Sequence, residues 1–245
     1  MNKPNMLIVG CCGSIGHEIC KHYAETYNII GIGIHKPVIS MDWYECNIVD
    51  LTALKSVCNV IMAKYESIDT IIYCSGISKP LDIAEVNEED WNLLYNVNVR
   101  GFEFIIHYLF PVIKKTPGMS IVQINSKSGK KGSKKNSIYA STKFAGIGLV
   151  QSLALELADY GVRVNCVCPG NVMASHTWQD VLFDKFAKQQ NLTPEGVKAK
   201  YIGLVPLGRE CYYSDIINAV DFLINKNSSY ITGQAINVTG GQQLY

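Results

Sequence analysis

Residues 6–16 read MLIVGCCGSIG, and this stretch decides the fold. Its first four residues are apolar, as in a buried strand. Three glycines follow at intervals of three, Gly10, Gly13 and Gly16, and residues 15–26 then have helical spacing. Glycines often do no more than end a strand. At the junction of a strand with a helix, they also let backbone N–H groups approach a pyrophosphate. The stretch therefore predicts a dinucleotide-binding turn.

Short apolar segments alternate with longer segments of helical spacing along the rest of the chain. The sequence predicts further strands at 28–34, 70–74, 120–125, 162–167 and 235–238, and helices at 51–65, 87–110, 137–160 and 214–224. Asp50 and Asn87 are the predicted N-caps of two of these helices. Apolar strands that alternate with helices are typical of a parallel sheet covered on both faces. We therefore predict an α/β chain with one doubly wound Rossmann-type domain over 1–245.

Residues 175–204 interrupt this alternation between two predicted strands. The segment is polar, has helical spacing and carries Trp178 and Phe183. Long insertions of this kind in compact domains are often functional. We expect a helical lid over the active site.

Composition excludes several classes of protein. The formal net charge is +1, whereas a general nucleic-acid binder carries a strongly basic face. No apolar run approaches the roughly 20 residues that a membrane helix needs. The nine cysteines form no CxxC pair and have no zinc-finger spacing. We expect reduced cysteines, a cytoplasmic protein without a signal peptide, and no metal, nucleic-acid or membrane partner.

The end of the second predicted strand bears on the choice of cofactor. An acid at this place binds the 2′-hydroxyl of NAD, and a basic group accommodates the 2′-phosphate of NADP. The segment here is Gly33-Ile34-His35-Lys36, without an acid. Because Lys36 could pair with the phosphate, we expect NADP to be slightly favoured over NAD. The alternative is that His35 and Lys36 are solvated surface residues.

Tyr139 and Lys143 are four residues apart on a predicted helix and so share one face. A free tyrosine has a pKa near 10, and a nearby ammonium group lowers the pKa of a phenol. A tyrosine tuned in this way can exchange a proton with an alcohol or carbonyl while hydride moves to or from a nicotinamide. Alone, however, this spacing is common on helix surfaces.

Taken together, the motifs resemble the short-chain dehydrogenase/reductase family over nearly the whole chain. They are the glycine turn, NVNVRG around Asn98, Ser126 before Tyr139, Lys143, RVNCVCPGNV and TGQAINVTGG. The resemblance implies that Ser126 holds the substrate oxygen and that Tyr139 is the acid/base. It implies that Lys143 lowers the tyrosine pKa and binds the nicotinamide ribose, and that Asn98 supports a water-linked proton relay.

The resemblance also implies where the cofactor binds. The implied cofactor-binding residues are Gly10, Gly13, Ser14, Ile15, Gly16, Gly33, His35, Lys36, Asn47, Ile48, Cys74, Ser75, Gly76, Tyr139, Lys143, Pro169, Gly170 and Val172. The chain departs from the family in its glycine spacing, in Asn47 where an aspartate usually contacts adenine, and in Ala174 where a threonine is usual. These departures concern cofactor preference and affinity more than the chemistry.

Five lysines lie within nine residues just ahead of Tyr139. Within the family, this segment is most similar to enzymes that act on a phosphorylated polyol. We expect Lys127, Lys130 and Lys134 to pair with a substrate phosphate, with Arg209 as a further partner. Lys131 and Lys135 are assigned to a solvated basic loop, which is also the alternative for the whole cluster.

These observations predict an NAD(P)-dependent oxidoreductase for a secondary alcohol or ketone of a sugar or polyol, and we expect this substrate to be phosphorylated. The alternatives are a ketoreductase for a lipid, polyketide or nucleotide-linked sugar, and a dinucleotide-binding regulator without turnover. The family resemblance also implies a homo-oligomer, a tetramer or dimer, through the two longest helices and the last strand. Small residues on the Tyr139 helix would permit close packing between or within subunits: Ala140, Ala145, Gly146 and Gly148.

Overall fold

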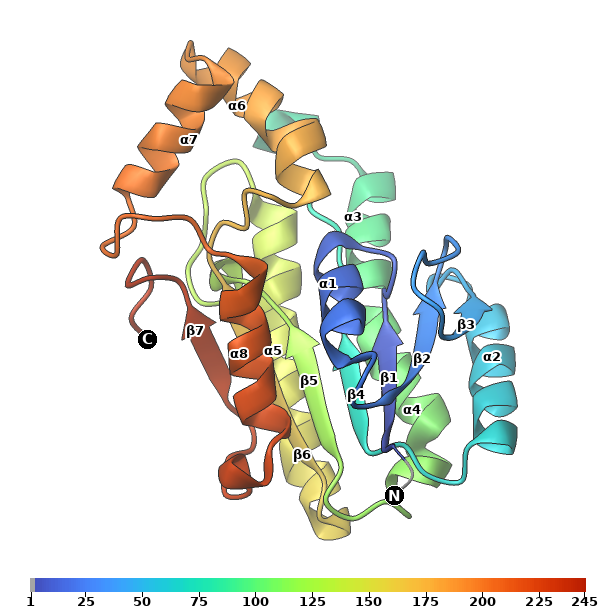
Figure 1. Cartoon of the computed structure of the whole chain (residues 1–245). Helices are drawn as coiled ribbons and strands as arrows, with labels where there is room; N and C mark the ends of the chain where they lie inside the picture. Colours follow the sequence, from blue (N-terminus) through green and yellow to red (C-terminus); the bar gives the residue numbers. More distant parts are fainter. Residues whose placement is uncertain (1–2) are drawn as a thin grey trace.

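The computed structural model describes residues 3–245, and within them seven parallel strands form one sheet (Figure 1). The strands are β1 Asn5–Val9, β2 Asn28–Gly33, β3 Asp42–Glu45, β4 Thr70–Tyr73, β5 Ser120–Ile124, β6 Arg163–Pro169 and β7 Ala235–Val238. Their order is β3-β2-β1-β4-β5-β6-β7, so the direction of winding reverses between β1 and β4. The sheet is the predicted doubly wound Rossmann-type sheet, and ligands bind such sheets beyond the carboxyl ends of the strands near this reversal.

Helices cover both faces of the sheet. They are α1 Ser14–Tyr23, α2 Leu51–Lys64, α3 Glu88–Tyr95, α4 Gly101–Ile113, α5 Ser137–Leu157, α6 Phe183–Gln190, α7 Pro194–Gly203 and α8 Tyr213–Ile224. Side chains along a strand point alternately to the two faces. Accordingly, Leu7 and Val9 belong to the core under α2, α4 and α5, and Met6 and Ile8 to the core under α1 and α8.

Asp50 and Asn87 cap helices as predicted. The Asp50 carboxylate accepts hydrogen bonds from the backbone N–H groups of Thr52 and Ala53, at 2.9 and 3.0 Å. The Asn87 side chain accepts one from the N–H of Asp90 at 2.9 Å. Each bond satisfies a donor that the first turn of a helix leaves unpaired.

The helix predicted over 87–110 is wrong in one respect, because a π-helical turn at Asn96–Arg100 divides it into α3 and α4. The buried hydroxyl of Tyr73 donates to the carbonyl oxygen of Val97 at 2.6 Å. A side chain that takes a helix carbonyl disturbs the regular hydrogen-bond ladder. Gly101 permits the approach, since a Cβ there would lie 2.5 Å from the Tyr73 hydroxyl.

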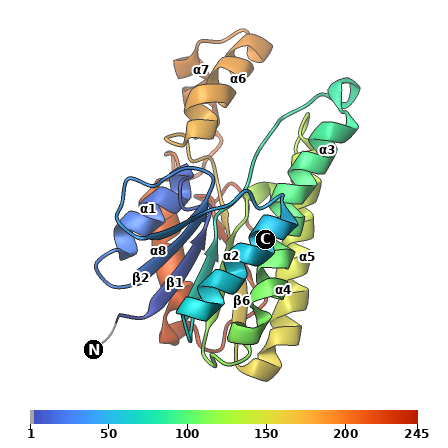
Figure 2. The same ribbon diagram turned by 90° about the vertical axis from the view of Figure 1, so that its right-hand side faces the viewer.

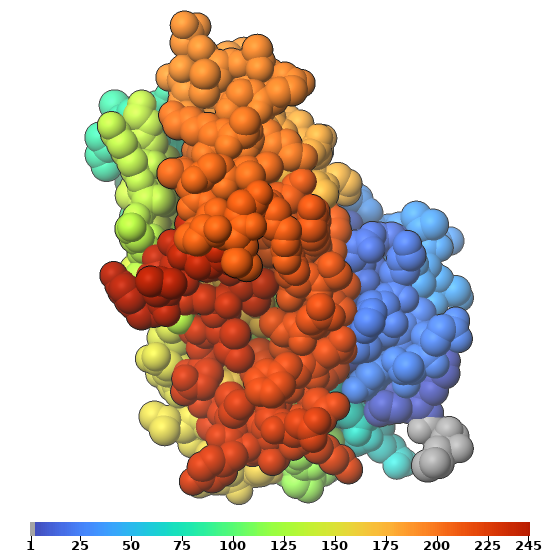
Figure 3. Space-filling model, turned by 60° about the vertical axis from the view of Figure 1, so that its left-hand side comes forward, coloured from blue at the N-terminus to red at the C-terminus, as the bar shows by residue number. Residues whose placement is uncertain are grey.

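The segment 175–204 is helical, as predicted, and projects beyond the carboxyl ends of the strands (Figure 2). A π-helical turn at Thr177–Leu182 leads into α6, and α7 returns beside it. The two helices enclose a small apolar cluster of their own around Trp178. The space-filling view shows this segment at one end of the molecule, with the C-terminal residues nearby (Figure 3). Leu207 N, just after α7, donates to Gly240 O at 3.1 Å.

Within residues 3–245, no helix has the length and apolar character that crossing a membrane requires. The cysteines in this range are all free thiols, and six of the nine are buried.

Candidate active site

A cavity of about 580 Å³ lies at the carboxyl ends of the strands. It extends from the glycine turn, past Ser126 and Tyr139, to Trp178 and Tyr201 of the helical segment. Its walls therefore come from the nucleotide-binding side of the sheet, from the β5–α5 connection and from the insertion that we predicted as a lid.

The glycine turn at one end of the cavity is shaped for an anion. Gly10 has φ +85°, and a Cβ on Gly16 would lie 2.1 Å from the Gly10 carbonyl oxygen, so both positions need glycine. Gly13 caps α1 without a side chain, and the first residues of α1 line the cavity. The first N–H groups of a helix have no partner inside the helix and bind anions such as a pyrophosphate. The turn thus fits the phosphates of a dinucleotide.

Ser126 is held in place at the end of β5 by its neighbour Asn125. The Asn125 side chain accepts a hydrogen bond from Ser126 N at 2.8 Å and donates to the carbonyl oxygen of Lys143 at 3.1 Å. The Ser126 hydroxyl in turn accepts from Ser128 N at 3.1 Å. One buried amide therefore fixes the serine loop against α5.

Replacing Gly146 by alanine is expected to disturb this arrangement. A Cβ on Gly146 would lie 2.8 Å from Asn125 Nδ2 and 2.9 Å from Gln123 Oε1, so both buried amides would have to move. We expect Gly146→Ala to destabilise the fold by about 1–3 kcal/mol and to lower kcat, as overpacking does. Thermal unfolding and steady-state rates measure both effects. Gly132→Ala, at an open and exposed site, is the control and should change neither.

The structure brings Tyr139 and Lys143 together with Ser126. The Lys143 ammonium nitrogen lies 5.7 Å from the centre of the Tyr139 ring and donates to Ile124 O at 3.4 Å. Burial raises the pKa of Tyr139, and its hydrogen bond with Ser126 lowers it in part. Burial also lowers the pKa of Lys143 to about 8. Desolvation and Ser126, rather than the expected ammonium charge, therefore dominate the tyrosine pKa in this structure.

Asn98 lies in the π-helical turn and is buried. Its side chain exchanges hydrogen bonds with the backbone of Ile77, at 2.8 and 3.0 Å, and donates to the Thr142 hydroxyl at 3.0 Å. Gly76 separates it from Lys143, since a Cβ on Gly76 would lie 3.5 Å from Asn98 Oδ1 and 3.3 Å from Lys143 Nζ. The four predicted catalytic residues thus surround one end of β4 and β5.

The predicted cofactor-binding residues divide into two groups. Those that line the cavity are Gly13, Ser14, Ile15, Gly16, Cys74, Gly76, Tyr139, Lys143, Pro169, Gly170 and Val172. Those that lie outside it are Gly10, Gly33, His35, Lys36, Asn47, Ile48 and Ser75. Two side chains of the second group are already engaged: that of Ile48 is buried in the core, and that of Asn47 accepts from Val49 N at 3.2 Å.

The lysine cluster is arranged differently from the prediction. Lys127 and Lys134 line the cavity, but Lys130 donates to Ala235 O at 2.6 Å and is not part of the lining. Lys135, assigned to the solvated loop, lines the cavity and pairs with Asp82 at 3.0 Å. For Lys130 and Lys135, a partner far away in the sequence determines where the ammonium group lies.

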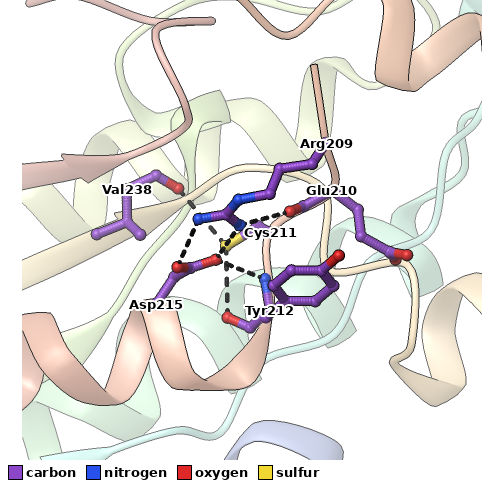
Figure 4. Close-up of polar contacts among 6 residues, drawn as sticks. All are labelled: Arg209, Glu210, Cys211, Tyr212, Asp215 and Val238. Atoms are coloured by element: carbon purple, nitrogen blue, oxygen red, sulfur yellow. Dashed lines mark hydrogen bonds and ion pairs between the residues drawn. The ribbon is translucent and has the colours of Figure 1, made fainter. Parts of the chain in front are cut away.

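Arg209 does not reach the cavity either, and its predicted contact with a substrate phosphate is not supported. Its guanidinium group binds the Asp215 carboxylate through two hydrogen bonds, of 2.6 and 2.9 Å, and lies 4.9 Å from the Tyr212 ring centre (Figure 4). The pair joins the chain after α7 to the first turn of α8. Arg209 is thus occupied by an acid that the sequence places six residues further on.

Replacing Arg209 by glutamine should therefore leave substrate affinity unchanged. The ion pair is partly exposed, and surface pairs contribute about 0–1 kcal/mol to stability. We expect Arg209→Gln to lower the melting temperature slightly and to leave KM for a phosphorylated substrate unchanged. A rise in KM for the phosphate ester alone would show that Arg209 does contact the substrate phosphate.

The structure adds residues to the cavity that the sequence reasoning missed. They are the amide side chains of Asn136, Asn171, Gln189 and Gln190, the imidazole of His176 and the apolar groups of Leu182, Phe186 and Tyr201. Asn171 follows directly on the predicted Pro169-Gly170 and could have been included on that ground. The others lie on the helical segment or in the serine loop, where the sequence gives no sign of which side chains face inward.

Comparison with known proteins now adds to this geometry. Residues 34–243 match the family model described as Enoyl-(Acyl carrier protein) reductase. Sorbitol-6-phosphate 2-dehydrogenase of Escherichia coli (strain K12) is 41% identical over 180 residues, which are 73% of this chain and 69% of that protein. The chain belongs to the short-chain dehydrogenase/reductase family. Galactitol 2-dehydrogenase of Agrobacterium fabrum is 31% identical over 260 aligned residues, with 100% of this chain and 99% of that one covered.

Solved structures of this family superpose closely on the chain. Sorbitol-6-phosphate 2-dehydrogenase from Erwinia amylovora has a TM-score of 0.92 at 30% identity, over 98% of this chain and 100% of that one. A short-chain dehydrogenase from Leptospira borgpetersenii with bound NAD+ has a TM-score of 0.86 at 26% identity, over 100% and 94%. ElxO with NADP bound has a TM-score of 0.84 at 25% identity, over 98% of each chain. The chain is thus a short-chain NAD(P)-dependent dehydrogenase or reductase.

Proposed function

We propose that this enzyme transfers hydride between a nicotinamide cofactor and the secondary alcohol or ketone of a phosphorylated sugar or polyol, of the sorbitol 6-phosphate and fructose 6-phosphate kind. The observation that carries the proposal is the charge of the cavity. Four lysines line it, and among the described residues that line it there is no aspartate or glutamate: the four are Lys127, Lys134, Lys135 and Lys143.

Lys127 is the lysine best placed for a substrate phosphate. It follows Ser126 directly, is partly buried, and donates to the neutral Gln242 side chain at 2.5 Å. Burial lowers its pKa to about 8, because the charged form is destabilised away from water. A bound anion would stabilise that charged form. A phosphate monoester carries about two negative charges and strong acceptor oxygens at neutral pH. The comparison with sorbitol-6-phosphate 2-dehydrogenase supports the same substrate class.

In this proposal each residue around the cavity has a separate role in the reaction. A bound nicotinamide dinucleotide would supply or accept the hydride, and the N-terminus of α1 would hold its phosphates. Ser126 orients the substrate oxygen, and Tyr139 exchanges the proton of that oxygen. Lys143, one helical turn away, stabilises the phenolate that remains after proton donation. Asn98 fixes the backbone at Ile77 and the start of α5.

Four further features of the protein stay predictions. We propose a slight preference for NADP, because no acid ends β2 and Lys36 is exposed there. We propose that the segment 175–204 acts as a lid, and that the chain forms a homo-oligomer through α4, α5 and β7. Gly146, however, already packs within the chain, against Asn125 and Gln123. The cytoplasmic location also stays a prediction.

A ketoreductase acting on an acyl substrate is the second candidate. Trp178, Leu182, Phe186 and Tyr201 give the helical segment an apolar wall on the cavity. An acyl chain could lie along that wall, and the matched family model is described as an acyl-carrier-protein reductase. The lysines in the rest of the cavity lining offer such a chain no partner.

The oxidation of sorbitol 6-phosphate with NAD or NADP, set beside the reduction of a β-ketoacyl thioester, tests the proposed function. Absorbance of the reduced nicotinamide follows both reactions. We expect turnover of the polyol phosphate, with kcat/KM in the range of about 10⁴ M⁻¹s⁻¹ or above. Turnover of the thioester alone would establish the ketoreductase instead.

A further inference from the structure

Unpaired amide groups are concentrated at the substrate end of the cavity. Among the described residues, six buried side-chain nitrogen or oxygen atoms have no hydrogen-bond partner. Three of the six belong to amides that line the cavity: Asn136 Oδ1, Asn171 Nδ2 and Gln190 Oε1. Buried polar atoms in proteins are nearly always paired, so each exception requires an explanation. Their shared location indicates a common partner that enters the cavity.

The three amides come from different walls of the cavity. Asn136 precedes α5, and its Nδ2 donates to the Ser133 hydroxyl at 3.1 Å. Asn171 follows β6, and its backbone oxygen accepts from Cys211 N at 3.2 Å. Gln190 ends α6 and, like Tyr201 of α7, lines the cavity.

Each of the three side chains has one buried, unpaired atom to offer to a ligand. The last torsion of an asparagine or glutamine side chain is soft, so a small rotation turns that atom toward the cavity. The amides of Asn136 and Asn171 are carried by the two chain segments that also carry Tyr139 and Gly170. A ligand whose reacting carbon lies at Tyr139 would therefore have its neighbouring atoms within the reach of this set.

We propose that Asn136, Asn171 and Gln190 recognise the hydroxyl groups of the substrate's carbon chain. This inference rests on the proposed function and specifies it. Two of the unpaired atoms are acceptors and one is a donor, and a hydroxyl group both donates and accepts. A chain of adjacent hydroxyls can thus pair with all three, whereas an acyl chain would leave them unpaired.

The charges in the cavity fit the same division. Neutral amides suit neutral hydroxyl groups, and the lysines are left for the phosphate. An amide set of this kind should make the enzyme selective against deoxygenated analogues, because a site built to hydrogen-bond a hydroxyl group rejects ligands that lack it. Specificity for a polyhydroxylated chain would then come from Asn136, Asn171 and Gln190, and affinity for the phosphate from the lysines.

The test compares Gln190→Met, which keeps the length of the side chain, and Asn171→Leu with wild type. Gln151→Met is the matched control, because this glutamine is exposed on α5 and lies outside the cavity. We expect kcat/KM for the polyol phosphate to fall about 10- to 100-fold in Gln190→Met and in Asn171→Leu, the effect of leaving a substrate hydroxyl unpaired. We expect less than about a threefold change in the control. Turnover of a hydroxyl-free aliphatic ketone should be unchanged in all three variants.

The outcomes separate the inference from the function on which it rests. An equal loss on the polyol and on the hydroxyl-free ketone would show a structural role and overturn the inference. So would unchanged polyol kinetics in both Gln190→Met and Asn171→Leu. Wild-type enzyme that turns over the ketone but no sugar or polyol would overturn the proposed function itself. Thermal melting and cofactor binding of each variant verify that it is folded.

Discussion

Replacing Tyr139 by phenylalanine is expected to lower kcat by about 10³- to 10⁴-fold while cofactor affinity changes little. The substitution removes the hydroxyl group that exchanges a proton with the substrate and leaves the ring, which helps to line the cavity. It also removes the hydrogen bond with Ser126 but leaves Lys143 in place. Steady-state kinetics and the fluorescence of bound reduced cofactor measure the two quantities separately.

Tyr95→Phe is the matched control for this experiment. The Tyr95 hydroxyl donates to the Ser141 side chain on the same helix as Tyr139, at 3.0 Å, but Tyr95 does not line the cavity. We expect nearly normal kcat in this variant. A Tyr139→Phe enzyme with more than about a tenth of the wild-type kcat would show that another group moves the proton, since general acid–base catalysis contributes at least about 10²-fold.

Removing the charge of Lys127 is expected to have the second largest effect. Lys127→Met should raise KM for the phosphorylated substrate by about 10- to 100-fold, because charge-assisted hydrogen bonds to phosphate contribute about 1.5–3 kcal/mol. It should leave KM for the unphosphorylated sugar unchanged. Lys130→Met is the control, since its ammonium group is bound to Ala235 O outside the cavity. An equal effect of both substitutions would contradict a phosphate contact by Lys127.

The same lysine predicts a pH dependence. Burial lowers the pKa of Lys127 to about 8, so the residue is cationic below that pH and loses its charge above it. The second ionisation of the phosphate, near pH 6, adds negative charge as the pH rises. KM for the phosphate ester should therefore be lowest between about pH 6.5 and 8 and rise above it. KM for the unphosphorylated sugar is the internal reference, because Lys143 has a similarly lowered pKa.

The parts of the structure that local sequence determines were predictable. The glycine turn follows from the steric needs of Gly10 and Gly16, and the Tyr139–Lys143 pair from helix periodicity. β3 was missed, because its four residues, Asp42–Glu45, lie at the edge of the sheet and have no apolar alternation. The break in the helix over 87–110 depends on the Tyr73 hydroxyl, which lies far away in the sequence.

Side-chain directions in the candidate site could not be predicted in the same way. Lys127 and Lys130 are three residues apart in one loop, yet one lines the cavity and the other binds β7. Arg209 was predicted to contact a phosphate, but its guanidinium group binds the Asp215 carboxylate in the folded chain. Long charged side chains follow their tertiary partners, and no periodicity in the sequence records those partners.

The central claim is that the cavity binds the phosphate ester of a sugar or polyol. The most direct test is the ratio of kcat/KM for fructose 6-phosphate to kcat/KM for fructose, measured with wild-type enzyme at pH 7 with NADPH and with NADH. If ammonium groups in the cavity pair with the phosphate, this ratio should be about 10² or more with either cofactor. A ratio near one would contradict the account and would make the lysines around the cavity ordinary surface charges.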